Sequence, residues 1–69
     1  MPGLADFSDQ EITGILMDYA AMHDLRYVSY WDDGEWHAHM FHADEPIATA
    51  EGDNNRAADE ALLRLLGLG

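Results

Sequence analysis

Apolar and aromatic residues recur at helical spacing in two segments, one near each end of the chain. In the first segment they are Ile12, Ile15, Leu16, Tyr19, Met22 and His23. In the second segment they are Ala58, Ala61, Leu62, Leu65 and Leu66. Side chains three and four residues apart lie on one side of a helix, so each stripe predicts an amphipathic helix that packs on a core.

Each predicted helix has recognisable end signals. Ser8 and Glu11 are spaced as a capping box, in which the serine hydroxyl accepts from the Glu11 amide and the glutamate carboxylate accepts from the serine amide. Gly67 is a natural stop for the second helix. The cap of that helix is expected at Asp53, Asn54 or Asn55.

The segment between the helices begins with a predicted β-hairpin. Residues 25–31 are rich in aromatic and branched side chains, and Asp33 and Gly34 supply a tight turn before a return strand over residues 35–41. The return strand alternates between its two faces. The residues that we expect to point inward are Trp36, Ala38 and Met40.

Two hairpin registers fit the sequence. A two-residue turn places Trp31 opposite Trp36, whereas a three-residue loop with Gly34 in a bulge places Tyr30 there. The aromatic residues of the hairpin also exceed what one inward face needs, which favours an exposed patch that binds a partner or forms a homodimer, with simple core packing as the alternative. These residues are Tyr27, Tyr30, Trp31, Trp36 and Phe41.

A short third strand over residues 47–51, closed by Gly52, completes the pattern. We therefore predict an α+β fold of order α-β-β-β-α, with a three-stranded antiparallel sheet and two helices packed on one face. Residues 1–69 make a single small domain.

The net charge of the chain limits the kinds of molecule that it is expected to bind. The 69 residues include fourteen acidic residues and only three arginines, with no lysine, for a formal net charge of −11. Binding to a phosphate backbone requires clustered Lys and Arg, so direct binding to nucleic acid is not expected. No apolar run is long enough for a membrane span, and cysteine is absent. We expect a cytoplasmic protein that contacts no membrane.

Catalysis finds little support in the sequence. Ser8 is used by the helix cap, Ser29 lies in mid-strand, and no glycine-rich phosphate loop or nucleophile elbow is present. Paired carboxylates such as Asp32 and Asp33 are more often turn residues than an acid–base pair. We predict a protein that is not an enzyme and has no cofactor.

Two histidines are the weak candidates for a metal site. His37 and His39 lie two residues apart on one strand face, as two ligands of a metal would. The alternative is that they are ordinary solvent-facing sheet residues, because a third ligand from the same strand would lie on the opposite face. No metal is expected in the leading interpretation.

The order of elements resembles the double-stranded-RNA-binding domain over nearly the whole chain. Gly34, His37 and Phe41 match the spacing of that family's glycine, histidine and phenylalanine around its second strand, and Gly52 and Ala58 match positions around its second helix. The departures are Ala50 in place of a glycine, and Asn54, Asn55, Arg56 and Asp59 in place of the family's lysine-rich cluster. The resemblance implies the family's shape without its grip on RNA.

In that family the RNA-reading end is formed by the helix N-termini and the first hairpin, and here the same end is acidic. The candidate partner-binding residues are Asp6, Asp9, Glu11, Asp32, Asp33, Glu35, Glu51 and Asp53. Taken singly, carboxylates near helix N-termini and in turns are ordinary dipole partners and turn residues. That alternative accounts for each carboxylate taken alone, but it does not account for eight of them at one end of the domain.

A second, weaker resemblance is to HicB-like antitoxins. The residues that carry it are Gly34, Trp36, Gly52, Asp53, Ala57 and Leu62. The capped first helix is not part of that pattern. Many short phage-encoded proteins share the same outline of helix, hairpin, strand and helix.

These patterns together predict a small acidic protein–protein interaction module. The leading hypothesis is a phage-encoded inhibitor that acts as a nucleic-acid (DNA) mimic and covers a basic surface of a nucleic-acid-binding protein. The alternatives are an antitoxin-type neutraliser of a basic nuclease, and a metal-binding domain that uses His37 and His39.

Overall fold

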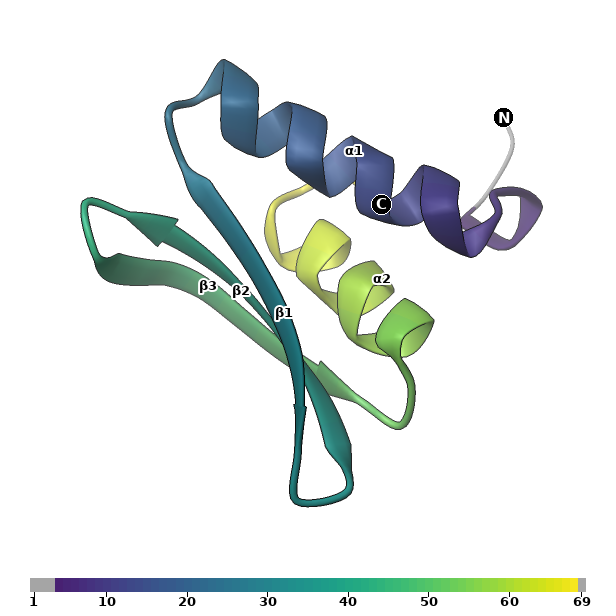
Figure 1. The fold of residues 1–69 in the computed structure, drawn as a ribbon. Coiled ribbons are helices and arrows are strands. Elements are labelled where there is room, and N and C mark those ends of the chain that lie inside the picture. Colours follow the sequence, from purple (N-terminus) through teal and green to yellow (C-terminus); the bar gives the residue numbers. More distant parts are fainter. Residues whose placement is uncertain (1–3, 69) are drawn as a thin grey trace.

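The computed structural model describes residues 4–68. Its elements are a 3-10 turn η1 (Leu4–Asp6), α1 (Asp9–Met22), β1 (Arg26–Asp32), β2 (Glu35–His42), β3 (Glu45–Gly52) and α2 (Asn55–Leu65). The three strands form one antiparallel sheet of order β1-β2-β3, and both helices cover the same face of it (Figure 1). The predicted α-β-β-β-α fold is confirmed.

Helix α1 begins with the predicted capping box. The Ser8 amide donates to Glu11 Oε1 at 2.9 Å, and the Glu11 amide donates to Ser8 Oγ at 3.2 Å. The prediction that Met22 and His23 face the core is wrong, because both are exposed. Met22 lies about 120° around the helix from the buried Leu16, and His23 is the C-cap, past the last packed turn.

The β1–β2 turn has two residues, which decides the hairpin register. Asp33 and Gly34 have φ angles of 51° and 83°, and two positive φ angles in succession define a type I′ turn. Trp31 therefore lies opposite Trp36. Tyr30 lies opposite His37, on the face of the sheet that the helices leave open.

The β2–β3 turn has the same shape but less suitable residues. Ala43 and Asp44 have φ angles of 50° and 71°. Alanine in this left-handed region places its Cβ against the following carbonyl oxygen, which costs about 1 kcal/mol or more. The strand pairing also shifts between Met40 and Phe41, where β3 contributes one extra residue, Ile47.

Because Ala43 is strained, we expect the Ala43→Asn substitution to raise the free energy of unfolding by about 0.5 to 1 kcal/mol. Asparagine tolerates the left-handed region far better than alanine does. Ala21→Asn on the exposed side of α1 is the control, and it should lower the same quantity by about 0.5 kcal/mol because asparagine is a poor helix former. Urea unfolding measures both, and an unchanged or lower stability in Ala43→Asn would contradict the expectation.

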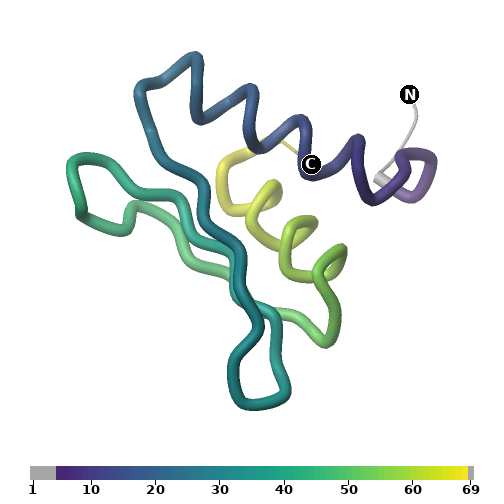
Figure 2. Tube along the Cα trace, in the orientation of Figure 1, coloured from purple at the N-terminus to yellow at the C-terminus, as the bar shows by residue number. Residues whose placement is uncertain are grey.

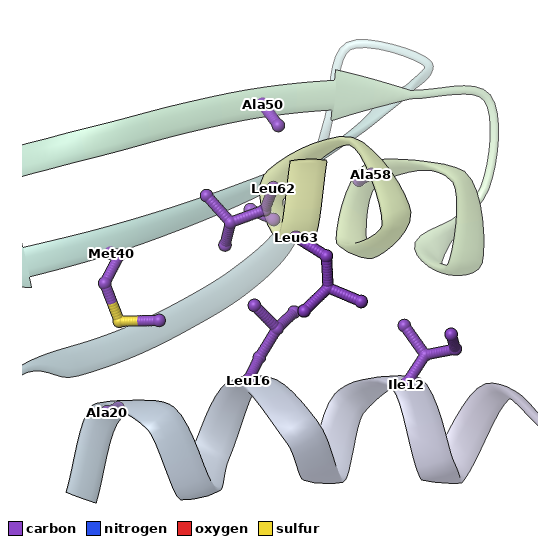
Figure 3. Close-up of a cluster of buried hydrophobic side chains, with 9 residues drawn as sticks. Ile12, Leu16, Ala20, Met40, Ala50, Ala58, Leu62 and Leu63 are labelled. Atoms are coloured by element: carbon purple, nitrogen blue, oxygen red, sulfur yellow. The ribbon is translucent and has the colours of Figure 1, made fainter. Parts of the chain in front are cut away.

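The core is a thin apolar layer between the helices and the sheet (Figure 3). Its buried hydrophobic residues are Ile12, Leu16, Ala20, Ala38, Met40, Ala50, Ala58, Leu62 and Leu63. Trp36 packs against this cluster, so the predicted inward face of β2 is confirmed. The small alanines let the helices approach the strands closely. A Cβ atom at Gly52 would lie 2.6 Å from the Ala58 amide nitrogen, which admits only glycine at the entry to α2.

Helix α2 buries a different side from the one that the leucine spacing predicts. Asn54 is the N-cap, and its Oδ1 accepts from the Ala57 amide at 2.8 Å. Leu65 was expected to be buried but is 61% exposed, whereas Leu63 is fully buried. The buried side of α2 centres on Ala58, Leu62 and Leu63, since the helix packs on the sheet with one flank and on α1 with the other.

Within residues 4–68, no helix is long and apolar enough to cross a lipid bilayer. The longer helix, α1, has 14 residues. A membrane-spanning helix needs about 20.

Candidate functional site

All eight acidic residues predicted to bind a partner lie on the surface. Each is classed as exposed: Asp6, Asp9, Glu11, Asp32, Asp33, Glu35, Glu51 and Asp53. Among the described residues, the single fully buried acid is Asp59, which is 1% exposed. The excess of negative charge therefore lies on the surface of the protein and not in its core.

The tertiary structure divides these eight acids into two groups. Asp6 lies in η1, just before α1, and Asp9 and Glu11 lie in the first turn of α1. The other five lie on the β1–β2 hairpin and at the end of β3. In Figures 1 and 2 the β1–β2 turn is at the bottom of the molecule and the start of α1 at the right, with the β3–α2 connection between them. The acidic residues therefore do not gather at one point, as predicted, but form two groups that are separated by the β3–α2 connection.

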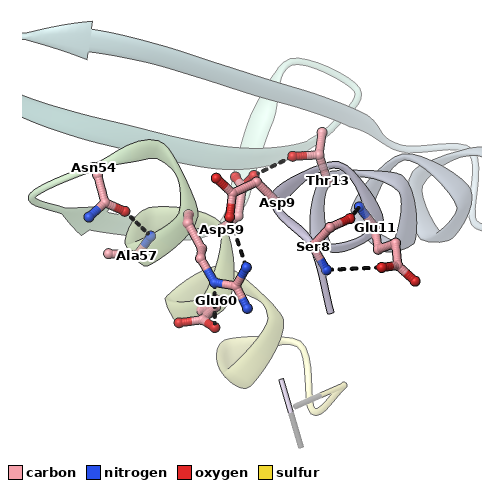
Figure 4. Close-up of polar contacts among 9 residues, drawn as sticks. Ser8, Asp9, Glu11, Thr13, Asn54, Ala57, Asp59 and Glu60 are labelled. Carbon is pink, nitrogen blue, oxygen red and sulfur yellow. Dashed lines mark hydrogen bonds and ion pairs between the residues drawn. The ribbon is translucent and has the colours of Figure 1, made fainter. Parts of the chain in front are cut away.

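Two of these three carboxylates, Asp9 and Glu11, have partners within the chain (Figure 4). Asp9 Oδ1 accepts from Arg56 Nη1 at 2.8 Å, and Arg56 also contacts Glu60 at 3.3 Å. This bridge joins the first turns of the two helices. Hydrogen bonds from Ser8, above all from its amide, lower the pKa of Glu11, while the bond to Asp9 raises the pKa of Arg56. Asp9 and Glu11 therefore have roles in the fold itself.

The acids of the hairpin have no such partners. Asp32 lies opposite Glu35 across the two strands, and Asp33 occupies the turn between them. Glu51 lies opposite His37 on the open face of the sheet, and Asp53 follows the end of β3. None of these five makes an ion pair with another residue in the range 4–68. We call Asp32, Asp33, Glu35, Glu51 and Asp53 the hairpin acids.

Further acidic residues lie at the opposite end of the molecule. Asp24 is in the α1–β1 connection, and Asp44 and Glu45 are at the β2–β3 turn. All three are exposed. In Figure 1 these two connections lie at the upper left, away from the β1–β2 turn. They supply a matched set of three carboxylates against which the hairpin acids can be tested.

The open face of the sheet carries a row of stacked rings. The Tyr30 ring stacks on His37 and on His39, with centroids 5.1 and 5.4 Å apart, and His39 stacks on Phe41 at 5.7 Å. The guanidinium of Arg26 lies 5.2 Å from the centre of the Phe41 ring. Of the aromatic residues from which an exposed patch was expected, Tyr30 and Phe41 lie in this row. Trp31 is the most exposed of them but lies on the helix-covered side, and Tyr27 and Trp36 pack against the core.

One histidine of this row, His39, is held by neighbouring hydroxyl groups. His39 Nδ1 lies 3.3 Å from Thr49 Oγ1, and its Nε2 lies 3.1 Å from the Tyr30 hydroxyl. Both ring nitrogens of His39 thus have partners, which competes with metal coordination. Within residues 4–68, no three His, Asp or Glu side chains gather as a metal site would require.

A buried polar cluster links three elements and escaped the sequence analysis. Asp59 on α2 accepts a hydrogen bond from the Thr13 hydroxyl on α1, at 2.8 Å (Figure 4). It also accepts one from the Tyr27 hydroxyl on β1. No side-chain polar atom buried within residues 4–68 lacks a partner. Asp59, placed by sequence among the residues that replace a lysine cluster, fixes α1 and β1 to α2.

Tyr27, a member of this cluster, makes the stability of the fold depend on pH. Burial, and then the hydrogen bond to Asp59, raise the pKa of Tyr27 above its ordinary value of 10.0. A raised folded-state pKa gives stability that is complete below the unfolded-state pKa and is lost as the pH rises through the folded-state pKa.

We therefore expect the parent chain to lose more of its free energy of unfolding between about pH 9 and about pH 11 than the Tyr27→Phe variant loses. Urea unfolding at the two pH values measures this difference. Equal losses in the parent and in Tyr27→Phe would contradict the expectation.

Comparison of this chain with protein families, with curated proteins and with solved structures finds no match. The resemblances to the double-stranded-RNA-binding domain and to HicB-like antitoxins accordingly stay predictions. Any functional assignment rests on the acidic surface and on the open face of the sheet.

Proposed function

We propose that this protein is an acidic interaction module that binds a basic, nucleic-acid-binding surface of another protein and so blocks it. The observation that carries the proposal is the group of five hairpin acids, which are exposed and have no ion-pair partner among residues 4–68. Exposed carboxylates on the β1–β2 hairpin and at the end of β3 present negative charge, as a phosphate backbone does.

The electrostatics of the whole chain support the same role. A net charge of −11 on a molecule of 7.7 kDa attracts a basic partner over long range and speeds their encounter. Arg56, one of the three arginines, pairs with Asp9 and Glu60, so it offsets little of the charge on the hairpin. An inhibitor of phage origin is the biological form in which we expect such a module.

Capture from a lysate, followed by displacement, tests the proposal. The parent chain is immobilised beside a variant in which Asp32, Asp33 and Glu35 are replaced by Asn, Asn and Gln. A control carries the same changes at Asp24, Asp44 and Glu45. Proteins that are retained by the parent and the control, lost on the hairpin variant, and released by duplex DNA are the expected partners.

The identity of the captured protein separates the two candidate roles. A nuclease among the displaced proteins would favour the antitoxin-type role, and other nucleic-acid-binding proteins the broader inhibitor. If no protein distinguishes the parent from the hairpin variant, or if DNA displaces none of those that do, the proposed function is wrong.

A further inference from the structure

Strand β1 is an edge strand whose outer side is uncovered. It pairs only with β2, and in Figure 1 it is the nearest strand, with no helix or loop in front of it. The two-residue turn makes Asp32 and Glu35 the hydrogen-bonded closing pair, so alternate residues of β1 direct their backbone groups to β2. Tyr27, Ser29 and Trp31 direct theirs outward, which leaves three N–H and three C=O groups available to another strand.

The opposite edge of the sheet differs from this one at the start of β3. Strand β3 contains Pro46, which has no N–H, and it is irregular at Ile47, where the pairing with β2 shifts. Proline and bulges are the usual devices that prevent an edge strand from pairing with another chain. Over Arg26–Asp32, β1 has neither device. Its sequence is suited to pairing.

The sequence of β1 is complementary to itself when two copies run antiparallel. Centred on Ser29, the pairing places Arg26 opposite Asp32 of the second copy, Tyr27 opposite Trp31, and Val28 opposite Tyr30. Opposite charges and aromatic residues directly across from each other are the pairs that stabilise a sheet. The same register aligns the outward-facing backbone groups of Tyr27, Ser29 and Trp31. Arg26 makes no ion pair within residues 4–68, so its charge is available.

The apolar surface beside this edge fits the same register. Trp31 is 61% exposed, and a hollow lies between α1 and the start of β1, lined by Met17, Ala20, Ala21, Leu25, Arg26 and Tyr27. Tyr27 and Trp31 project on the helix-covered side, as their partners Met40 and Trp36 do. In the antiparallel pair, Trp31 of the second copy would lie beside Tyr27, at this hollow.

We propose that two copies of this chain associate through β1 in the register centred on Ser29, forming a continuous six-stranded sheet. This goes beyond the proposed function, because the second copy is the partner and no basic protein is involved. Asp32 takes part in both proposals, but the association is measured on the chain alone, so its failure can be told apart from failure of the proposed function. The pairing would extend the ring-bearing open face of one copy into that of the other.

A charge exchange tests both the association and its register. In Arg26→Asp, two acids face each other twice in the dimer, and in Asp32→Arg two arginines do. We expect each single variant to dissociate at least about tenfold more readily than the parent, and an equal mixture of the two to form a heterodimer, because both charge pairs are then restored with opposite signs. Sedimentation equilibrium measures the association. Salt at about 0.15 M screens the repulsion between the two negatively charged chains.

The matched control is Arg64→Asp, which makes the same charge change at the far end of α2 and should associate as the parent does. Circular dichroism checks that each variant is folded. Ser29→Pro removes an amide that faces outward and leaves the pairing with β2 intact, so it should give a folded monomer. A parent that stays at 7.7 kDa at about 0.1 mM would overturn the proposal. So would single variants that associate as the parent does, or a mixture that stays monomeric.

Discussion

Replacing Asp59 by alanine is expected to lower the free energy of unfolding by about 3 kcal/mol. The carboxylate is 1% exposed and accepts from the hydroxyls of Thr13 and Tyr27, so its removal leaves two partly buried donors without an acceptor and opens a small cavity. A domain of 69 residues has a total stability on the order of 3 to 10 kcal/mol. The substitution therefore removes a large fraction of it.

Urea unfolding followed by circular dichroism measures this loss. Asp18→Ala, on the exposed side of α1, is the matched control and should change the stability by less than about 0.5 kcal/mol. Once Asp59 is alanine, adding Thr13→Val and Tyr27→Phe should cost little more, because the hydroxyls that they remove have already lost their acceptor. A stability of Asp59→Ala within about 0.5 kcal/mol of the parent would contradict the structural role of the cluster.

Neutralising the β1–β2 turn should weaken binding to the proposed basic partner at least about a hundredfold. The variant carries Asp32→Asn, Asp33→Asn and Glu35→Gln. Each of these carboxylates, if desolvated against a basic group, contributes on the order of 1 to 3 kcal/mol, and three such losses exceed a hundredfold even if they are not fully additive. Its folding stability should be equal to or higher than that of the parent, since Asn–Gly is the preferred pair in a type I′ turn.

The control for this prediction carries the same chemistry at the other end of the molecule. Asp24→Asn, Asp44→Asn and Glu45→Gln also remove three charges, and Asp44 likewise occupies a turn position with positive φ. Calorimetry at moderate salt, with the captured partner, should give a loss several times smaller for the control. Equal losses in both variants would show that net charge alone drives binding, and unchanged affinity in the hairpin variant would refute the proposed surface.

The order of the elements could be predicted because its signals are local. The Ser8 cap, the Asp33–Gly34 turn and the Gly67 stop each act within a few residues, and each is present in the structure. The hairpin register stayed open in the sequence, because two-residue and three-residue turns both accept Gly34 at positive φ. The backbone angle of Asp33, which only the structure supplies, decides between them.

The buried cluster could not be predicted from the sequence. An aspartate that follows a polar first turn is typical of an exposed helix position, since isolated acids are rarely buried. Its partners, Thr13 and Tyr27, are 46 and 32 residues away along the chain. The same limit applies to the acidic residues. Exposure of the eight carboxylates followed from their residue type, but the ion pair between Asp9 and Arg56 depends on how the two helices meet.

Pro46 and the extra residue at Ile47 have a consequence for the growth of the sheet. A sheet that accepts new strands at both sides can add chains without limit and becomes a fibre. In the pairing that we propose, each chain uses its β1 side, which leaves a β3 strand at each outer boundary of the six-stranded sheet. Pro46 and the extra residue Ile47 would oppose the addition of a third chain at these boundaries, so the proposed pairing implies a closed dimer and no fibre.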